Sequence, residues 1–327
     1  VSLIKAMLDE EKIKSELVGN SGIPVSARAK EIDENTVCVA EVSSFQLESV
    51  SDFKPHIACV LNITPDHLTR HYTMDNYIYL KRRILKNLKE SEYAVLNYDD
   101  ETVRSFSDEL RAETLWVSVK EKTNGAYAEN GKLCFGEEEI ADISEMTVKG
   151  EHNVYDALFA IASAKLLGLK TESIIAALKN FRGVPHRIEP VAELGGVKFY
   201  DDSKATNTAG AIAAIKTMSV PTVLILGGSE KGEKYEELFK EIRRSEVKHT
   251  VITGASRFNM FEAAGKAGLS DVTVTAKFDT AVKIAKMFAK PGDAVLLSPA
   301  CASFDDFSGY EERGARFLKA VKEEDKR

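Results

Sequence analysis

The 327-residue sequence has no excess of basic charge, few cysteines and no long apolar run. Its 44 lysines and arginines against 51 aspartates and glutamates give a net charge of −7 without a basic stripe, which argues against a nucleic-acid partner. No apolar stretch approaches the roughly 18 residues that span a bilayer, and no signal segment is recognisable, so no membrane partner is expected. The four cysteines are far apart and form no C-x-x-C pair, which predicts buried free thiols. These absences favour small-molecule chemistry in a cytoplasmic protein of about two domains.

Two common nucleotide-binding motifs are also absent. The sequence has no G-x-x-x-x-G-K-[ST] loop, and "LILGGSEKG" carries two glycines but no G-x-G-x-x-G. The opening "VSLIKAMLDE" has apolar residues at helical spacing, with Ser2 as its one potential cap and no initiator Met. We therefore expect this helix to be the remainder of an element whose start lies upstream.

Short apolar runs alternate with amphipathic stretches and predict an α/β fold with a mostly parallel sheet covered on both faces. Strands are expected at "TVCVAEV", "IACVLNI" and "YAVLNYDD", with a helix over 77–88. Two Asn-Gly pairs between 115 and 148 predict a small antiparallel excursion. Ala-rich helices are expected over 154–168 and 171–180.

The prolines and glycine of "FRGVPHRIEPV" predict a domain boundary that separates residues 1–182 from residues 183–327. Beyond it, "VKFYDD", "TVLILGG", "HTVITG", "VTVTA" and "AVLLSPA" read as strands, each followed by a helical stretch. This alternation predicts a compact Rossmann-like second domain.

Polar side chains gather directly after two strands of the first domain, where ligands bind in open α/β sheets. In "VAEVSSFQLE", Glu41 could hold Mg²⁺ through a carboxylate oxygen, or the serines and glutamine after it could simply cap a helix. In "VLNITPDHLTRH", Asp66 and His67 near Glu41 would form a metal or proton-handling site, whereas Pro65 with Asp66 could equally be a helix start. Both alternatives stay open on these residues alone.

Two further strand ends lie in the second domain. In "FYDDSKATN", Asp202, Ser203 and Lys204 lie together at the end of an expected strand. Helix capping explains one or two of the polar residues of this string but not all. "LLSPACASFDDFSGYEERG" has successive small residues that would let backbone amides approach a ligand, although packing alone also produces such turns.

Six strings occur together in one order: "EVSSFQLE", "LNITPDHLTRH", "GEHN", "PHRIE", "DDSKATN" and "SPACASFDDFSGYEERG". In this order they resemble the Mur ligase family along the whole chain, and the first and last strings resemble its D-glutamate-adding branch. The resemblance implies a central P-loop-type ATPase domain at 1–182, lacking its first strand and P-loop here, and a C-terminal Rossmann-like, amino-acid-binding domain at 183–327. The family's UDP-binding domain would precede both, so we expect the 327 residues alone to be inactive.

The implied activity is ligation of D-glutamate to UDP-N-acetylmuramoyl-L-alanine, driven by ATP through an acyl phosphate, in a cytoplasmic monomer of peptidoglycan precursor synthesis. Several anions meet in such a reaction, so Mg²⁺ and cationic side chains are required where charge gathers. The family's metal positions are matched by Glu41, His67 and Lys81, and Lys204 matches a lysine facing the phosphates. The lysine that aligns with Lys81 is carbamylated in the family, which turns a cation into an anionic ligand for magnesium.

The remaining matches concern the substrates. Precursor contacts are matched by Asn20, Ser43 and His67. Nucleotide contacts are matched by Asn153, Asp156, Arg187, Asp202 and Lys204. The D-glutamate pocket is matched by Thr206, Lys231, Ser303 and Tyr310. Asp156 stands where the family commonly has Asn, and a carboxylate cannot donate to a purine nitrogen as an amide can.

Two alternatives to this function remain. One is another amide ligase of the same fold, such as the diaminopimelate- or lysine-adding sibling or a folylpolyglutamate synthase. The other is a non-catalytic nucleotide-binding α/β module, for which the missing P-loop is the reason.

Overall fold

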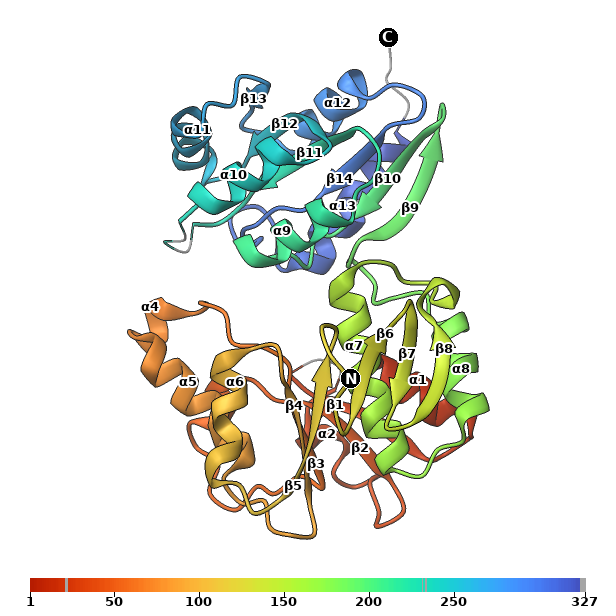
Figure 1. The fold of residues 1–327 in the computed structure, drawn as a ribbon. Coiled ribbons are helices and arrows are strands. Elements are labelled where there is room, and N and C mark those ends of the chain that lie inside the picture. The colour runs from red at the N-terminus through yellow and green to blue at the C-terminus, as the bar shows by residue number, and fades with distance from the viewer. Residues whose placement is uncertain (21–22, 231, 233, 324–327) are drawn as a thin grey trace. The chain divides into compact units, whose positions relative to one another are not determined.

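The protein is described by a computed structural model, which covers residues 1–20, 23–230, 232 and 234–323 (Figure 1). The chain divides into two compact units, Val1–Gly183 (unit 1) and Val184–Arg327 (unit 2), and each is described by itself. Across the described ranges, no helix combines the length and the apolarity that crossing a membrane requires.

Unit 1 is built on a six-stranded sheet of order β3-β4-β5-β6-β7-β8. Its strands are β3 (Ile57–Val60), β4 (Tyr93–Asn97), β5 (Glu113–Ser118), β6 (Ala126–Glu129), β7 (Lys132–Phe135) and β8 (Glu138–Asp142). The first four run parallel, whereas β7 and β8 add antiparallel hairpins. The expected antiparallel excursion is therefore confirmed for β6 to β8 but wrong for β5.

The two Asn-Gly pairs behave differently. Asn130 and Gly131 both have positive φ, 51° and 79°, and form the β6–β7 hairpin turn as predicted. Asn124 lies instead between the parallel strands β5 and β6, where its amide bonds the backbone of Thr114 and Trp116. The same dipeptide therefore makes a hairpin only where no competing side-chain bond ties it to a neighbouring strand.

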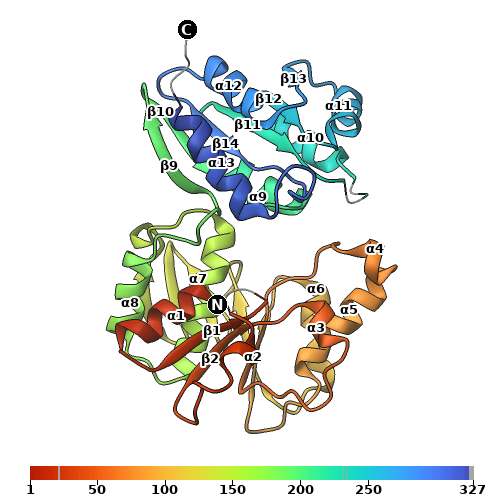
Figure 2. The same cartoon turned by 180° about the vertical axis from the view of Figure 1, so that it is seen from behind.

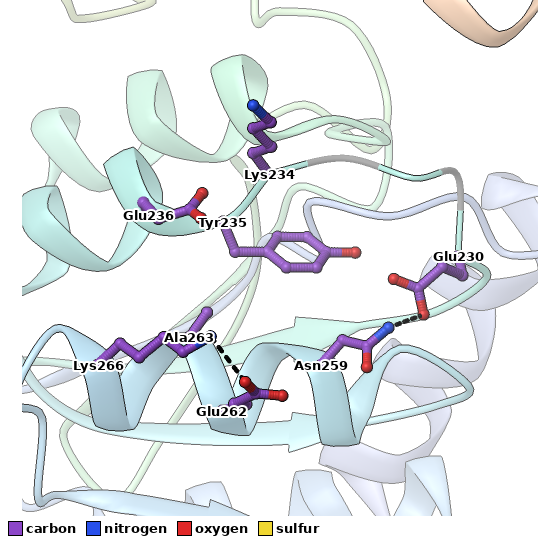
Figure 3. Close-up of a pocket in the computed structure, with 8 residues that line it drawn as sticks. All are labelled: Glu230, Lys234, Tyr235, Glu236, Asn259, Glu262, Ala263 and Lys266. Carbon is purple, nitrogen blue, oxygen red and sulfur yellow. Dashed lines mark hydrogen bonds and ion pairs between the residues drawn. The ribbon is translucent and has the colours of Figure 1, made fainter.

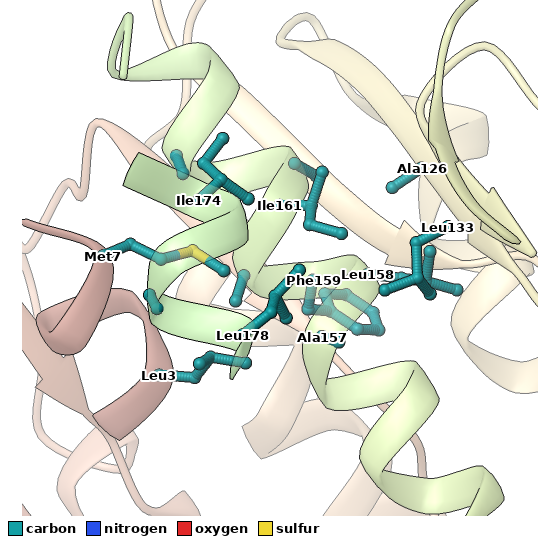
Figure 4. Close-up of a cluster of buried hydrophobic side chains, with 14 of the residues drawn as sticks. Leu3, Met7, Ala126, Leu133, Ala157, Leu158, Phe159, Ile161, Ile174 and Leu178 are labelled. Atoms are coloured by element: carbon teal, nitrogen blue, oxygen red, sulfur yellow. The ribbon is translucent and has the colours of Figure 1, made fainter. Parts of the chain in front are cut away.

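Helices cover both faces of this sheet. One face packs on α1 (Ser2–Glu10), α7 (Glu151–Leu166) and α8 (Thr171–Asn180), and eight consecutive residues of α7 are buried. Figure 4 shows Leu3 and Met7 of α1 near Ile174 and Leu178 of α8. The predicted opening helix and the 171–180 helix are confirmed, while α7 begins three residues earlier than expected.

The other face packs on α5 (Met74–Arg82), the 3₁₀ turn η1 (Arg83–Leu85), α6 (Glu101–Arg104) and the 3₁₀ turn η2 (Ser105–Glu109). The helix expected over 77–88 begins earlier because the Thr73 side chain accepts the Asn76 N–H, and it tightens into η1 after Arg82. Unit 1 also contains η3 (Ile143–Glu145), the short helices α2 (Val25–Arg28), α3 (Ser44–Leu47) and α4 (Leu68–His71), and a parallel pair β1 (Ser15–Gly19) and β2 (Val37–Glu41).

Unit 2 is the predicted Rossmann-like fold, with strand order β13-β12-β11-β14-β10-β9. The strands are β9 (Glu189–Leu194), β10 (Val197–Asp201), β11 (Thr222–Gly227), β12 (Val247–Thr253), β13 (Val272–Val274) and β14 (Ala294–Leu297). All pair parallel except β9, an edge strand that carries Pro190 and joins β10 through Gly195 and Gly196. The sequence analysis missed β9.

Alternate strand residues of unit 2 face two helical layers. Leu224 and Leu226 pack with α9 (Thr208–Thr217), α10 (Glu236–Arg244) and α11 (Arg257–Lys266). Val223 and Ile225 pack with α12 (Phe278–Phe288) and α13 (Tyr310–Lys322), the layer seen in Figure 2. Because β10, β11 and β14 are parallel, the polar residues after each strand meet at one edge of the sheet.

The cysteines fit the prediction in part. All four are free, and Cys134 and Cys301 are buried. Cys38 is exposed, which corrects the expectation, because every second residue of the short β1–β2 pair turns away from the core.

Candidate functional site

Asn20 directly follows β1, Glu41 is the last residue of its partner strand β2, and the two are hydrogen-bonded to each other. The Asn20 backbone N–H donates to the Glu41 carbonyl at 2.8 Å, and its amide donates to Glu41 Oε1 at 2.9 Å. Gly19 allows this approach, because a Cβ there would lie under 3.0 Å from the Glu41 carbonyl oxygen. Two residues predicted separately, for precursor and for metal, thus form one pair.

Ser43 caps helix α3. Its hydroxyl accepts the Gln46 N–H at 3.3 Å, and its own N–H donates to the Gln46 side chain at 2.9 Å, which completes a capping box. The capping interpretation of this string is therefore confirmed for Ser43 and Gln46. A substrate contact at Ser43 stays a prediction.

His67 stands in the left-handed region, at φ 55°, immediately before α4. Its N–H donates to Asp66 Oδ1 at 2.8 Å, its Nε2 lies 3.7 Å from Asp66 Oδ2, and 40% of its side chain is exposed. The helix begins only at Leu68, so the expectation that Pro65 and Asp66 start it is wrong: a left-handed residue cannot continue a right-handed helix.

Lys81 points back along α5 over the ring of Tyr77, with its Nζ 5.2 Å from the ring centroid, as its spacing from Tyr77 predicts. Burial lowers the pKa of Lys81, and the charges of Asp66 and Glu41 oppose that shift. Both carboxylates therefore lie near the Lys81 amine. Asp66, named above with His67 as a possible metal or proton-handling group, bonds the His67 N–H and also acts electrostatically on Lys81.

His71 was not predicted as a site residue from the sequence. Its fully buried ring lies 2.9 Å from Ser44 Oγ through Nε2, stacks on Phe45 at 5.1 Å and contacts Tyr77 at 5.3 Å. Nδ1 lies 3.9 Å from Glu48 Oε1, and neither atom has a hydrogen-bond partner among the described residues. Its place four residues after His67, in the same "DHLTRH" string, was the signal that could have found it.

The nucleotide candidates of unit 1 lie on the first turns of α7. The Asn153 amide donates to the Lys149 carbonyl at 2.7 Å and lies 3.1 Å from His152 Nε2. Asp156 follows three residues later on the same face and is half-buried. Asn153 and Asp156 are therefore placed so that both could contact one ligand, and their nucleotide roles stay predictions.

In unit 2, Asp202 points into the protein. It is 3% exposed, and its carboxylate accepts the Ser298 hydroxyl at 2.6 Å and the Ile188 N–H at 3.2 Å. Burial raises the pKa of Asp202 to about 7, against a smaller opposing effect of Arg187. Its predicted nucleotide contact would have to compete with these internal bonds.

Lys204 and Tyr310 lie together, with Lys204 Nζ 5.4 Å from the Tyr310 ring centroid. Ser303 is buried in the small-residue turn between β14 and α13, and Thr206 is half-buried beside Asn207, which caps α9. Lys231 lies outside the described residues. Within unit 2 the structure thus brings a predicted phosphate residue and a predicted D-glutamate residue side by side.

Arg313 holds this region together and was also missed. The side chain is 1% exposed; Nε donates to Ser203 Oγ at 2.9 Å, Nη2 to the Ser203 carbonyl at 2.8 Å and Nη1 to the Ala302 carbonyl at 3.1 Å. Burial lowers the pKa of Arg313 to about 10. An arginine in the apolar face of a helix, as in "YEERGARFL", was the signal in the sequence.

A hollow of about 190 Å³ between α10 and α11 is separate from these residues (Figure 3). It is lined by Glu230, Lys234, Tyr235, Glu236, Asn259, Glu262, Ala263 and Lys266. Within it, Lys266 pairs with Glu262, and the Asn259 amide donates to Glu230. Among the described residues, no predicted site residue lines it.

Carboxylate, imidazole, hydroxyl and lysine groups at strand ends of two α/β units define a class of α/β enzyme that handles anionic small molecules. The families described as "Mur ligase middle domain" and "Mur ligase, glutamate ligase domain" match residues 1–164 and 186–301. The chain belongs to the Mur ligase family.

Relatives along the sequence agree with this assignment. UDP-N-acetylmuramoylalanine--D-glutamate ligase of Thermoanaerobacter sp. (strain X514) is 43% identical over 329 residues, covering 98% of this chain and 72% of that protein. The protein of the same name from Caldanaerobacter subterraneus subsp. tengcongensis is 41% identical over 323 residues, with the same coverage.

Solved structures share the fold. MurF from Acinetobacter baumannii has a TM-score of 0.73 at 16% identity, covering 97% of this chain and 73% of that one. MurF ligase from Thermotoga maritima in complex with ADP has a TM-score of 0.71 at 17% identity, covering 98% and 78%. Mur ligases are ATP-dependent enzymes that form amide bonds, so this chain is a ligase of that class, and a non-catalytic module is not favoured.

Proposed function

We propose that the protein adds D-glutamate to UDP-N-acetylmuramoyl-L-alanine in peptidoglycan precursor synthesis. The observation that carries this proposal is the 43% identity over 98% of the chain to ligases of that name. In the first step, a carboxylate oxygen of the alanyl group attacks the γ-phosphorus of ATP and releases ADP. In the second, the D-glutamate amine attacks the acyl phosphate, phosphate leaves, and the amine loses a proton.

The residue types in unit 1 support a magnesium ion as the metal. Glu41 offers a carboxylate that Asn20 orients, His67 offers a part-exposed imidazole, and a carbamate on Lys81 would offer oxygens. When bound, Mg²⁺ would supply positive charge beside the phosphates and the reacting carboxylate. Glu41, His67 and Lys81 would hold it, and His67 would also contact the precursor with Asn20 and Ser43.

Carbamylation of Lys81 is supported by its surroundings. Carbon dioxide reacts with a neutral amine, and burial lowers the pKa of Lys81 toward that form. The Tyr77 ring beneath the amine limits the directions in which a carbamate can extend. Lysine 81 is then an anionic ligand, whereas Arg82 and Arg83 on the same segment remain cations.

The other predicted residues divide between nucleotide and amino acid. We assign Lys204 to the phosphates, where its ammonium stabilises charge in transfer. The nucleotide is further contacted by Asn153, Asp156, Arg187 and Asp202. The D-glutamate carboxylates are bound by Thr206, Lys231, Ser303 and Tyr310. We further propose a cytoplasmic monomer that binds neither nucleic acid nor membrane.

The test uses the protein as its gene encodes it, with ATP, Mg²⁺ and UDP-N-acetylmuramoyl-L-alanine. Phosphate release and product mass are measured with D-glutamate, L-glutamate, meso-diaminopimelate or L-lysine as the amino acid. We expect phosphate release and one new amide product with D-glutamate only. Turnover with another amino acid and none with D-glutamate would assign the protein to a sibling ligase.

A further inference from the structure

An imidazole–carboxylate pair in unit 2 has no place in the proposed chemistry. His186 Nδ1 donates to Asp201 Oδ2 at 2.7 Å, and Asp201, the last residue of β10, is 1% exposed. Burial raises the pKa of Asp201, and the bond to His186 opposes that shift. The other carboxylate oxygen accepts the Ser203 N–H at 2.8 Å. Both oxygens of Asp201 therefore hold segments of chain in place.

The pair lies directly over Gly314 of helix α13. A Cβ at Gly314 would come under 3.0 Å from both His186 Nδ1 and Asp201 Oδ2, so no other residue fits beneath the pair unless it moves. Glycine inside a helix costs about 0.5–1 kcal/mol relative to alanine, so helix stability does not explain it. By contrast, Gly265 in α11 has open space where a Cβ would be.

The backbone of His186 is held in an unfavourable conformation. Its φ of 62° lies in the left-handed region, which a non-glycine residue adopts only when its surroundings require it. The His186 N–H donates to Glu189 Oε2 at 2.8 Å, and the Lys204 N–H donates to the His186 carbonyl at 3.0 Å. The strained residue thus bonds directly to the backbone of Lys204.

The side chains of His186 and Lys204 are also linked, through the ring of Tyr310. The His186 ring meets the Tyr310 ring edge-on, with centroids 6.0 Å apart at 76°, and Lys204 Nζ lies 5.4 Å from the centroid of the same ring. His186 therefore contacts Lys204 twice, through a backbone bond and through Tyr310.

Ligand atoms of His186, Glu189 and Asp201 lie within 4.8 Å of one another, a spacing that a metal ion could also use. Their close approaches are already donor–acceptor pairs, His186 Nδ1 with Asp201 and the His186 N–H with Glu189. A hydrogen-bonded support explains the group without a cation.

We propose that the His186–Asp201 pair, seated on Gly314, is a positioning device that fixes Lys204 for contact with the nucleotide phosphates. The inference deepens the proposed function, since it rests on the assignment of Lys204 to the phosphates. His186 itself is a positioning residue and does not touch the reacting atoms.

The first test compares two glycine variants, Gly314→Ala and its matched control Gly265→Ala, both inside helices. We expect Gly265→Ala to keep kcat and both Michaelis constants within about twofold. Gly314→Ala should lower kcat about tenfold and weaken ADP affinity, measured by calorimetry, by a similar factor, because Lys204 moves with the displaced pair.

The second test separates the backbone of His186 from its side chain. Asparagine tolerates the left-handed region and places an amide near the position of Nδ1, so His186→Asn should stay within about threefold of the parent in kcat and ADP affinity. His186→Ala loses both features and should resemble Gly314→Ala. In Gly314→Ala and His186→Ala, ADP affinity should change more than the KM for D-glutamate does.

Parental kcat and ADP affinity in Gly314→Ala and His186→Ala would overturn the proposal. The proposal would also be overturned if His186→Asn and His186→Ala lost the same activity while ADP affinity and D-glutamate KM changed equally and Tm fell in parallel. That pattern indicates a merely structural role. ADP affinity does not depend on which amino acid is added, so failure of the D-glutamate assignment is read separately in the amino-acid panel.

Discussion

The candidate residues of the two units differ in how the chain holds them. In unit 1, Glu41, His67 and Lys81 are part-exposed, and the contacts that relate them are mainly electrostatic. In unit 2, Asp201 and Arg313 are buried. Asp201 makes hydrogen bonds to His186 and Ser203, and Arg313 donates two hydrogen bonds to Ser203 and one to Ala302, in the segments that follow β10 and β14.

This difference shows which interactions hold the candidate residues of each unit in place. Buried charges are retained only when their hydrogen bonds are satisfied, so the unit 2 loop is set by the protein itself. In unit 1, the carboxylates of Glu41 and Asp66 act electrostatically on the Lys81 amine, and carboxylate and imidazole groups are ligand types that could hold a cation. Substitutions in unit 1 should therefore act mainly on chemistry, and those in unit 2 mainly on stability or position.

The largest expected effect is that of Lys81→Ala in the protein as its gene encodes it, with Lys86→Ala, an exposed lysine on the following turn, as the control. Loss of an anionic metal ligand should lower turnover by about three orders of magnitude, while the control stays near the parent. An added short carboxylic acid should partly restore activity by occupying the vacated position. Full activity in Lys81→Ala would sink the proposal, and failure of rescue would leave an ordinary structural lysine.

The next effect is a loss of stability in unit 2. Arg313→Ala removes three buried hydrogen bonds and leaves a large cavity, so we expect a loss of about 3 kcal/mol or more. Arg316→Ala, three residues along α13, breaks a part-exposed pair with Asp279 and should cost about 1 kcal/mol or less.

The one tryptophan of the chain separates the two units in this experiment. Trp116 lies in unit 1, so its fluorescence follows that unit, whereas circular dichroism follows both. In urea, Arg313→Ala should move the circular-dichroism transition to lower concentration and leave the Trp116 transition in place. Similar shifts in both signals, or equal losses in the two arginine variants, would contradict the contrast between the units.

The sequence predicted most of the fold because its signals are local. Strands such as β11 are buried on both faces and read as continuous apolar runs. Strand β9 was not predicted because Pro190 and the half-exposed residues around it resemble a linker, although Gly195 and Gly196 mark a turn. Asn124 misled the prediction because its side chain bonds a strand eight and ten residues away, which no dipeptide signal reveals.

The site was predictable where chemistry follows a strand end. That rule found Glu41 and Asp202, since both lie at or directly after a parallel strand. It could not find Arg313 or Gly314, because Ser203, which Arg313 bonds, and the His186–Asp201 pair over Gly314 are more than 100 residues away in the chain. Such contacts depend on how α13 packs over β10, and helix periodicity predicts only that one face is buried.

A smaller effect concerns the buried His71 of unit 1. His71→Phe keeps the stacking on Phe45 and Tyr77 but removes the partner of the Ser44 hydroxyl, and should lower turnover about tenfold through the neighbouring precursor contacts. Ser44→Ala removes the same bond from the other side. The double variant should lose little more than either single variant, because both break one interaction. Additive losses in kcat/KM for the precursor would show that the two side chains act independently.

The smallest effect is a pH dependence of unit 2. Burial raises the pKa of Asp202 from 3.8 to about 7, so the folded protein keeps this proton where the unfolded chain has lost it. The stability associated with the bound proton is fully present below about pH 4 and is lost as pH rises to about 7.

Asp202→Asn has no such proton to lose and keeps one carbonyl acceptor. Its Tm relative to the parent should therefore rise by several degrees between about pH 4.5 and 7.5 and then level off. A difference that stays constant over that range for Asp202→Asn would mean that its carboxylate is charged in the folded protein and that unit 2 stabilises the charge.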